Sequence, residues 1–349
     1  MDTLSSPLVC VCIPCYNAER TIIETLRSLQ KQTYTNFEIH VFDNASEDKT
    51  VELVRSIADE RVYLHIAEET GTAESNFTRC LNLGRGEYTA IYHADDLYDP
   101  TIIEKEVKFL VKNKEACGVL TFATQIDSQG QRLKTFLAPK SLGLSPGESR
   151  IFDVKLLFKA VLKHDNFLFC PSAMMRTSVC VNHIKTWRGD LFKSSADLDV
   201  WFRLADLGGI GLLNEPLLFY RISDMQWTAS YRKKRTTQSD TFLVLDAWMK
   251  KEGIKQTMKT SDVVNYQKLQ RYDMLGCMLN AVRNNEIGLA RDVWLKSGVF
   301  SFVTELLQMD STRDFKFFAL SSILKMMLVP LMGEVLRYLF LKHLNKVRL

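Results

Sequence analysis

The stretch "LVCVCIPCYNAERTIIETLRSLQKQTYTNFEIHVFDNAS", residues 8–46, decides the fold class. It opens on a short β-rich run that stops at Pro14, and it closes on a second β-rich run that ends near Asp43. The segment between them carries apolar residues at helical spacing, namely Ile22, Ile23, Leu26 and Leu29. A strand, a helix and a second strand in this order are typical of a sheet of parallel strands with helices packed on it.

The same alternation continues to about residue 120. Further strands are expected at residues 62–68 and 88–94, and further helices at 47–60, 76–83 and 101–113. Because strand and helix patterns keep alternating, we predict an α/β fold with a mostly parallel central sheet and helices on both faces.

Beyond residue 120 the alternation of strands and helices is less regular. Residues 125–151 hold many turn formers, which predicts a hairpin or a loop. The expected elements that follow are a strand within 166–178, a helix at 195–209 with a glycine stop, and a strand at 210–223. Helical patterns take over from about residue 231. We therefore predict a first domain over residues 1–230 and a helical region over 231–349.

Composition sets bounds on the class of protein. Hydrophobic residues make up 46% of the 349 residues and net charge is only +4, so a proper core is expected and nucleic acid is not an expected partner. The eight cysteines lack the paired spacing of a zinc site. Cys10, Cys12 and Cys15 are expected to be small core residues. The N-terminus lacks the pattern of a signal peptide, which favours the cytosol.

Polar clusters follow three of the predicted strands, at residues 14–17, 43–46 and 93–96. In open parallel sheets, ligands bind beyond the carboxyl ends of the strands. Each cluster alone predicts little more than a turn. Because all three would fall along one edge of the sheet, together they predict a binding site there.

The third cluster contains adjacent carboxylates, Asp95 and Asp96, whose like charges repel each other. They could cap the next helix, act as an acid–base pair, or hold a divalent cation that removes the repulsion. A cation shared with a phosphate ligand explains the pair best. Neither a G-x-G-x-x-G after the first strand nor a G-x-x-x-x-G-K-[ST] occurs, which argues against a dinucleotide dehydrogenase and a P-loop enzyme.

Four motifs in order resemble those of family 2 glycosyltransferases, which have the Rossmann-like GT-A fold. They are "VCIPCYNAERTIIETLRSLQKQTYTNFEIHVFDNASEDKT", "SNFTRCLNLGRGEYTAIYHADDLYDP", "FCPSAMMRTS" and "SADLDVWFRLADLGGIGLLNEPLLFYRIS", within residues 8–226. The resemblance implies an inverting, Mn²⁺- or Mg²⁺-dependent transfer from a nucleotide-diphosphate sugar, with a UDP-sugar most expected. The implied acceptor is a glycan or polyprenol-linked glycan, as in surface polysaccharide or O-antigen assembly. Residues 8–120 would bind the donor and residues 121–230 the acceptor.

The resemblance also implies roles for single residues. Asp95 and Asp96 would bind the cation, and Asp197 would be the catalytic base. Tyr16 would lie against the nucleobase, and Asp43 would accept a hydrogen bond from its edge. The full implied donor-binding set is Pro14, Tyr16, Asn17, Glu19, Asp43, Asn76 and Asp95.

Three positions depart from the pattern of the family. His93 stands where an acidic residue is common, and Ser75 stands where an arginine is common, with Arg79 as a candidate substitute. Ser223 and Asp224 follow "YR", where many members carry a histidine. His93 and Ser223 are the features that favour the alternative hypothesis, a catalytically inactive nucleotide-sugar or glycan-binding module. A second alternative is a scaffold that recruits enzymes to a membrane.

Asp197 has two interpretations from the residues alone. It can be a first-turn carboxylate that stabilises the helix at 195–209, or a base whose pKa is raised by burial. Asp199 lies roughly 200° further around that helix, so the two carboxylates cannot face one pocket. The resemblance favours Asp197 as the base.

The segment from Phe315 to the end is strongly apolar with a basic terminus. Charged residues and a proline interrupt the run, which argues against a membrane-spanning helix. The open interpretations are a buried helical hairpin, a face for a homodimer, and an amphipathic segment on the inner face of the plasma membrane.

Overall fold

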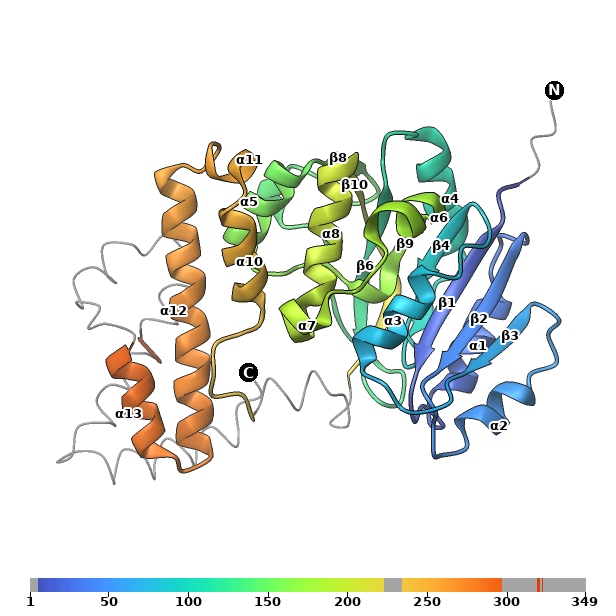
Figure 1. Ribbon diagram of the computed structural model, residues 1–349, viewed down its shortest axis with the longest axis horizontal. Coiled ribbons are helices and arrows are strands. Elements are labelled where there is room, and N and C mark those ends of the chain that lie inside the picture. The colour runs from blue at the N-terminus through green and yellow to red at the C-terminus, as the bar shows by residue number, and fades with distance from the viewer. Residues whose placement is uncertain (1–5, 223–233, 297–318, 321, 323–349) are drawn as a thin grey trace. The chain divides into compact units, whose positions relative to one another are not determined.

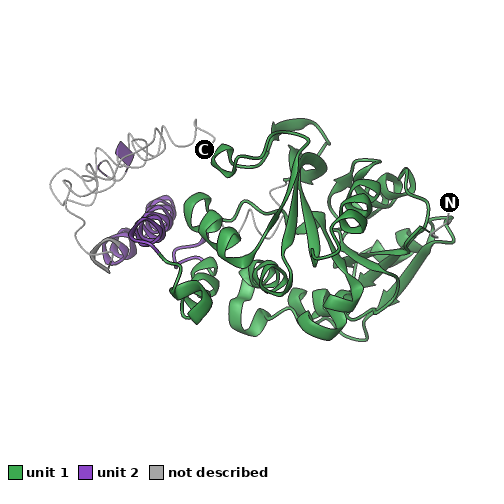
Figure 2. Ribbon diagram, turned by 90° about the horizontal axis from the view of Figure 1, so that it is seen from above, with its two compact units in different colours: residues 1–223, 240–258 green, residues 224–239, 259–349 purple. Residues whose placement is uncertain are grey.

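The computed structural model describes residues 6–222, 234–296, 319, 320 and 322. Its contacts divide the chain into two compact units (Figure 2). The first unit comprises residues 1–223 and 240–258, and the second comprises residues 224–239 and 259–349.

The first unit is built on a single ten-stranded sheet. Its main path has the strand order β3-β2-β1-β4-β9-β6-β10-β5, with β7 paired to β6 and β8 paired to β10 (Figure 1). The strands are β1 (Val9–Cys15), β2 (Phe37–Asp43), β3 (Val62–Ile66), β4 (Tyr88–Ile91), β5 (Leu97–Tyr98), β6 (Gly118–Ile126), β7 (Arg132–Thr135), β8 (Ser149–Phe152), β9 (Ala173–Arg176) and β10 (Ile210–Arg221).

Parallel pairing joins β3, β2, β1 and β4, and it also joins β6 to β10. Strand β9 runs antiparallel between β4 and β6 and connects these two parallel groups. The α/β class with its mostly parallel central sheet and flanking helices is thus confirmed. Within residues 125–151, where a hairpin or a loop was expected, the structure has a hairpin, because β7 folds back on β6.

Helices cover both faces of the sheet (Figure 1). Ile22 and Leu26 of α1 and Ile103 of α4 share one core with Val11 and Ile39 of the sheet. The helices of the first unit are α1 (Ile22–Gln30), α2 (Thr50–Arg55), α3 (Ala73–Leu81), α4 (Ile102–Lys112), α5 (Val154–His164), α6 (Thr177–Val179), α7 (Gly189–Phe192), α8 (Ala196–Leu207), α10 (Thr241–Met249) and α11 (Glu252–Lys255).

The cysteines of β1 are core residues, as predicted. Cys10 and Cys12 are fully buried and Cys15 nearly so. Side chains alternate along a strand, so Cys10 and Cys12 point away from the α1 side. The Cys12 thiol lies 3.7 Å from the carbonyl oxygen of Cys80 on α3, which places α3 on the opposite face.

A glycine ends helix α8, and an N-cap aspartate begins helix α5. The predicted glycine stop after α8 is present, because Gly209 has φ +101°, a conformation that L side chains rarely adopt. Helix α5 was missed by the sequence prediction. Its N-cap is Asp153, whose carboxylate accepts a hydrogen bond of 2.8 Å from the amide of Leu156.

The second unit is helical, in line with the pattern expected from residue 231. Its described helices are α12 (Thr260–Arg283) and α13 (Ile287–Lys296), which pack through Leu275, Met278 and Ala290. Among the described residues, no helix is both long and apolar enough to cross a membrane. The segment predicted as a hairpin, dimer face or membrane anchor lies outside the described residues, apart from positions 319, 320 and 322.

Candidate active site

The carboxyl ends of β1 and β2 meet at one edge of the sheet. Cys15 and Asp43 are partners in the parallel register, and the amide of Asn44 donates a hydrogen bond of 2.9 Å to the carbonyl of Cys15. The polar clusters after β1 and β2 are therefore neighbours, as the βαβ pattern predicts.

Hydrogen bonds join the loop after β1 to the loop after β2. The amide of Asn17 donates to the hydroxyl of Ser46 at 2.9 Å, and the side-chain oxygen of Asn17 accepts from the amide of Glu47 at 2.9 Å. The carboxylate of Glu19 accepts from the amide of Lys49 at 3.2 Å. Asn17 and Glu19, both predicted to bind the donor, thus hold the two loops together.

Tyr16 and Asp43 differ sharply in their exposure. Tyr16 is 46% exposed beside a half-buried Pro14, so its ring is open to a ligand. Asp43 is fully buried. Its carboxylate accepts hydrogen bonds from the Ser46 amide at 2.9 Å and hydroxyl at 2.5 Å, and from the Cys15 thiol at 3.6 Å. The side chain of Asp43 is therefore held in place at the ends of the two strands.

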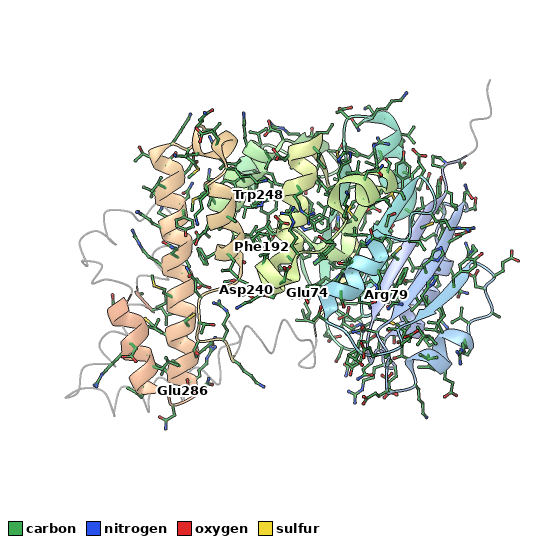
Figure 3. The ribbon with its side chains drawn as sticks, viewed as in Figure 1. Glu74, Arg79, Phe192, Asp240, Trp248 and Glu286 are labelled. Carbon is green, nitrogen blue, oxygen red and sulfur yellow. The ribbon has the colours of Figure 1, made fainter. Side chains whose placement is uncertain are left out.

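Asn76 and Arg79 on α3 support these strand ends. The side chain of buried Asn76 donates to the carbonyl of Phe42 at 2.7 Å and accepts from the Arg79 guanidinium at 2.9 Å. Arg79, labelled in Figure 3, also donates to the carbonyls of Asp43 and His65, each at 3.1 Å. Arg79 was a candidate for contact with the donor, and its guanidinium is instead engaged with backbone carbonyls.

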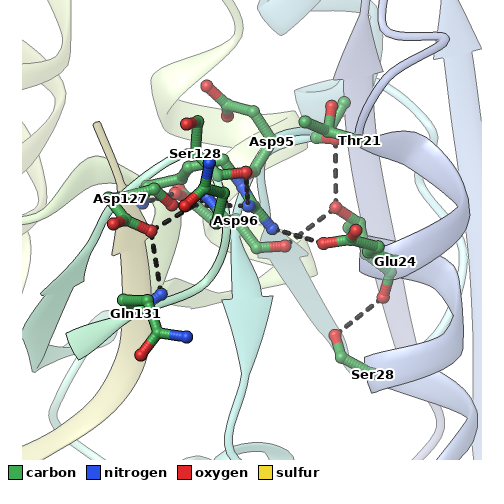
Figure 4. A network of polar contacts seen from close by, with 12 residues as sticks. Thr21, Glu24, Ser28, Asp95, Asp96, Asp127, Ser128 and Gln131 are labelled. Carbon is green, nitrogen blue, oxygen red and sulfur yellow. Dashed lines mark hydrogen bonds and ion pairs between the residues drawn. The ribbon is translucent and has the colours of Figure 1, made fainter. Parts of the chain in front are cut away.

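The loop between β4 and β5 presents the carboxylate pair. The guanidinium of Arg221, at the end of β10, donates to the carbonyl of Asp95 at 2.9 Å and to that of Ser128 at 3.0 Å. It also forms an ion pair of 2.6 Å with Glu24 on α1. Figure 4 shows this network, which ties the loop to α1 and to the turn between β6 and β7.

Asp96 is fully buried, and only one of its two carboxylate oxygens has a hydrogen-bond partner among the described residues. One carboxylate oxygen accepts the backbone amide of Arg221 at 2.8 Å, and the other has no hydrogen-bond partner among the residues that the structure describes. Burial raises the pKa of Asp96 well above its usual range, and the charge of Asp95 adds to this effect.

His93 completes a set of donors that suits a divalent cation. One donor atom each from His93, Asp95 and Asp96 can be chosen so that all three lie within 4.8 Å of one another. Burial lowers the pKa of His93, although the charge of Asp95 opposes the shift. A neutral imidazole and two carboxylates are ordinary ligands of divalent metal ions, so the residues present fit a cation.

Asp197 lies in the first turn of α8. Burial raises its pKa from 3.8 to about 6, although hydrogen bonds from backbone amides oppose the shift. The thiol of Cys170 lies near it, because the pKa of this thiol is raised by burial and then by the charges of both Asp197 and Asp96. The charges of Asp197 and Asp96 therefore both act on one thiol, although the two carboxylates lie about a hundred residues apart in the sequence.

Asp199 has a different environment although it is only two residues further on. It is buried, pairs with Arg203 at 2.8 Å, and accepts a hydrogen bond of 3.0 Å from the indole of Trp248 on α10. Trp248 is labelled in Figure 3. Asp199 thus joins α8 to α10 inside the first unit.

Sequence reasoning missed Arg221 and Cys170. The only local signal for Arg221 was its place in the "YR" that ends a predicted strand. Its role depends on contacts with residues 93 to 197 positions away in the sequence. Cys170 carried no signal beyond its place in the third motif.

Known proteins share both the sequence motifs and the fold. The sequence profile of glycosyl transferase family 2 matches residues 10–182. The chain is 33% identical over 208 residues to the putative glycosyltransferase EpsE of Bacillus subtilis, covering 58% of this chain and 69% of EpsE. It is 27% identical over 241 residues to an uncharacterised glycosyltransferase of Methanocaldococcus jannaschii, covering 68% of this chain and 78% of that protein. A shorter match, 33% over 106 residues, reaches the Escherichia coli UDP-Glc:alpha-D-GlcNAc-diphosphoundecaprenol beta-1,3-glucosyltransferase WfgD, covering 30% of this chain and 42% of WfgD.

Two solved structures share the fold. S. aureus TarS 1–349 in complex with UDP-GlcNAc has a TM-score of 0.50 at 14% identity, covering 85% of this chain and 90% of that one. The mannosyltransferase PcManGT from Pyrobaculum calidifontis, in complex with GDP-Man and Mn²⁺, has a TM-score of 0.50 at 15% identity, covering 99% and 88%.

The fold is of the GT-A type, the fold of these two glycosyltransferases. The chain belongs to glycosyl transferase family 2, because the family profile and the similarity to EpsE agree. The resemblance drawn from its four motifs is thereby confirmed.

Proposed function

We propose that this enzyme moves a sugar, with inversion, from a nucleotide-diphosphate sugar to a hydroxyl group of a glycan or lipid-linked glycan. One observation carries the proposal. Asp197, whose pKa is about 6, and the cation-binding loop with Asp96 share the half-buried Cys170 as a common neighbour. The influence of both carboxylates on one thiol supports a shared site for the base and the diphosphate.

The proposed roles follow from the environments of the residues. Tyr16, which is exposed, packs against the nucleobase. Asp43 accepts a hydrogen bond from the base edge, which in this proposal requires the loop that buries its carboxylate against Ser46 to shift when the donor binds. Asp95 and Asp96 hold the divalent cation, Mn²⁺ or Mg²⁺, which supplies positive charge to the departing diphosphate when bound. We retain Pro14, Asn17, Glu19 and Asn76 as donor-site residues. The hydrogen bonds of Asn17, Glu19 and Asn76 to the loops and strand ends support a positioning role for these three.

Asp197 acts on the acceptor in this proposal. Its carboxylate takes the proton of the acceptor hydroxyl as the hydroxyl oxygen attacks the anomeric carbon. The bond from that carbon to the phosphate oxygen breaks on the opposite face, so nucleotide diphosphate leaves and the configuration inverts. A pKa near 6 suits this task, because the carboxylate is charged at neutral pH and is still basic enough to accept a proton.

The known relatives support the choice of substrates. WfgD uses a UDP-sugar and a diphosphoundecaprenol-linked acceptor according to its name, and TarS is in complex with UDP-GlcNAc. We infer a UDP-sugar donor and a polyprenol-linked or other glycan acceptor, in polysaccharide assembly. We further propose that residues 8–120 bind the donor, that residues 121–230 face the acceptor, and that the region 231–349 brings the enzyme to the cytoplasmic face of the membrane or to a second subunit.

The test is a screen of nucleotide sugars with the purified full chain. Each sugar is added with Mn²⁺, and both thermal stability and release of nucleotide diphosphate are measured, because a ligand that binds the native state raises its stability. A UDP-sugar should raise the melting temperature and release UDP. Stabilisation without any release, with or without glycan acceptors, would instead favour the inactive binding module.

A second measurement tests the cation site. Asp96→Ala should abolish the Mn²⁺-dependent part of UDP binding in calorimetry, while Asp190→Ala, at an exposed position on α7, should leave it intact. If UDP binding by Asp96→Ala still depends on Mn²⁺ as in the wild type, Asp96 does not bind the cation.

A further inference from the structure

His93 brings an imidazole nitrogen to the carboxylate pair. A nitrogen of His93 and one oxygen each from Asp95 and Asp96 lie within 4.8 Å of one another. Two ligand atoms on opposite sides of an ion, with bonds of about 2.1 Å, are about 4.2 Å apart. A small closing movement would therefore place all three atoms around one ion.

Two buried polar atoms in this cluster have nothing to bind. Among the residues that the structure describes, neither Nε2 of His93 nor the second carboxylate oxygen of Asp96 has a hydrogen-bond partner. A buried polar atom without a partner destabilises the folded state, so native proteins rarely leave two together. An ion between them would satisfy both at once.

The position of His93 is fixed by its neighbours. Its backbone amide donates a hydrogen bond of 2.6 Å to the hydroxyl of Tyr98, and Tyr98 stacks on Tyr92 with a ring separation of 4.2 Å. The imidazole packs edge-on against Phe77 on α3 at 5.5 Å. A ligand that is held before the ion arrives is typical of built metal sites and unlike a mobile surface histidine.

We propose that His93 is a nitrogen ligand of the cation and that it makes the site prefer Mn²⁺ to Mg²⁺. The inference rests on the proposed function only in taking this loop as the cation site. Mg²⁺ prefers an all-oxygen shell, whereas imidazole nitrogen suits first-row transition ions. With His93 in place of a third carboxylate, the three side chains carry two negative charges rather than three, which weakens the Coulomb attraction for both ions, so the preference comes from the nitrogen donor.

Pulsed electron paramagnetic resonance of bound Mn²⁺ tests the ligand directly, without any turnover. The spectrum of the full chain with Mn²⁺ and UDP should show coupling to a nitrogen nucleus bound to the ion. Labelling histidine with ¹⁵N should shift that coupling. His93→Asp should retain bound Mn²⁺ and lose the coupling, whereas His183→Asp, at an exposed position on the segment Cys180–Ile184, should keep it.

Calorimetry then tests the preference between ions. Titration of Mn²⁺ and of Mg²⁺ into each variant, with UDP present, gives a ratio of affinities. His93→Asp should lower the Mn²⁺-to-Mg²⁺ ratio by about tenfold or more, because the nitrogen ligand is replaced by oxygen. His183→Asp should leave the ratio within about twofold, because an exposed side chain remote from the ion changes only a screened charge.

The outcomes separate this inference from the proposed function. Bound Mn²⁺ without nitrogen coupling, or an unchanged affinity ratio in His93→Asp, would overturn the role of His93. Failure of the chain to bind Mn²⁺ at all would overturn it too, and UDP binding in a chelator would then leave the glycosyltransferase proposal standing. Nitrogen coupling in a protein that transfers no sugar would support His93 and count against the proposed function.

Discussion

The backbone amide of Arg221 donates a hydrogen bond of 2.8 Å to one carboxylate oxygen of Asp96, and it leaves the other oxygen without a partner among the described residues. The same residue holds the carbonyl of Asp95 through its guanidinium. Arg221 therefore fixes the carboxylate loop from the end of β10 and leaves one oxygen of Asp96 available to a ligand. The loop depends on a strand that lies more than a hundred residues further along the chain.

Arg221→Lys should loosen this loop. Lysine cannot reproduce the planar fork that reaches Asp95, Ser128 and Glu24 together, so buried carbonyls lose their partners. We expect a loss of about 2–4 kcal/mol in the free energy of unfolding and weaker Mn²⁺-dependent UDP binding. Denaturant titration and calorimetry measure the two effects.

Arg61→Lys is the matched control. Arg61, just before β3, pairs with Asp59 and is partly exposed, so this substitution should lower the free energy of unfolding by about 1 kcal/mol or less. If Arg221→Lys proves no more costly than Arg61→Lys and binds UDP normally, the loop does not depend on Arg221.

Asp43→Asn should weaken recognition of the base and spare recognition of the phosphates. A hydrogen bond to a charged group contributes about 1.5–3 kcal/mol, so UDP binding should fall by about tenfold or more. Inorganic pyrophosphate should bind as before. Ser46→Ala removes the hydroxyl that supports Asp43 and keeps the charge, so it serves as the control for a disturbed loop. Equal losses for UDP and pyrophosphate in Asp43→Asn would show that Asp43 does not contact the base.

Asp197→Asn should stabilise the fold at neutral pH. The folded-state pKa of about 6 lies above the ordinary value of 3.8, so between these values the folded state binds more protons than the unfolded state. Stability therefore falls as pH rises through this window, and the full cost of the charge is present above pH 6. Denaturant titration at pH 7.5 should show a gain of about 1–3 kcal/mol for Asp197→Asn.

That gain should disappear as the pH approaches 4, where the native carboxyl is also uncharged. Asp190→Asn, exposed on α7, should change stability little at either pH. Equal stability of Asp197→Asn and the wild type at pH 7.5 would mean that the carboxylate of Asp197 is well solvated.

Asp199→Asn should destabilise the protein strongly, in contrast to Asp197→Asn. Removing one partner leaves the buried charge of Arg203 uncompensated, which typically costs about 3–5 kcal/mol. Trp248 can still donate to the amide oxygen of asparagine, so the loss reports the ion pair. Asp206→Asn, at an exposed position of the same helix, should cost about 0.5 kcal/mol or less. Comparable losses at positions 199 and 206 would contradict a structural role for Asp199.

The fold around the donor site was predictable because its signals are local. Residues 8–46 contain two strands and a helix with clear periodicity, and parallel pairing then places Asp43 next to Cys15. The separation of Asp197 from Asp199 also followed from helical geometry alone. Helix α5 was detectable too, since Asp153 is a good N-cap before an apolar-periodic segment.

Other features depend on contacts that no local pattern encodes. Strand β9 was expected within residues 166–178, but its antiparallel place between β4 and β6 follows from the whole sheet. The contact of Arg221 with Glu24 spans 197 positions. Arg79 was compared with an arginine of the family by sequence proximity, while its three-dimensional neighbours are the carbonyls at the ends of β2 and β3.

The most direct test of the account compares Asp197→Asn with the wild type in donor binding and in sugar transfer. With the UDP-sugar that the screen identifies, the dissociation constant should stay within about twofold, because the base does not contact the nucleotide. The turnover number should fall by about 10²-fold or more, the usual scale for loss of a general base. Wild-type turnover should itself decline as the pH drops below 6, where Asp197 takes up a proton. If Asp197→Asn transfers sugar at close to the wild-type rate, Asp197 is not the base, and the proposed mechanism is wrong.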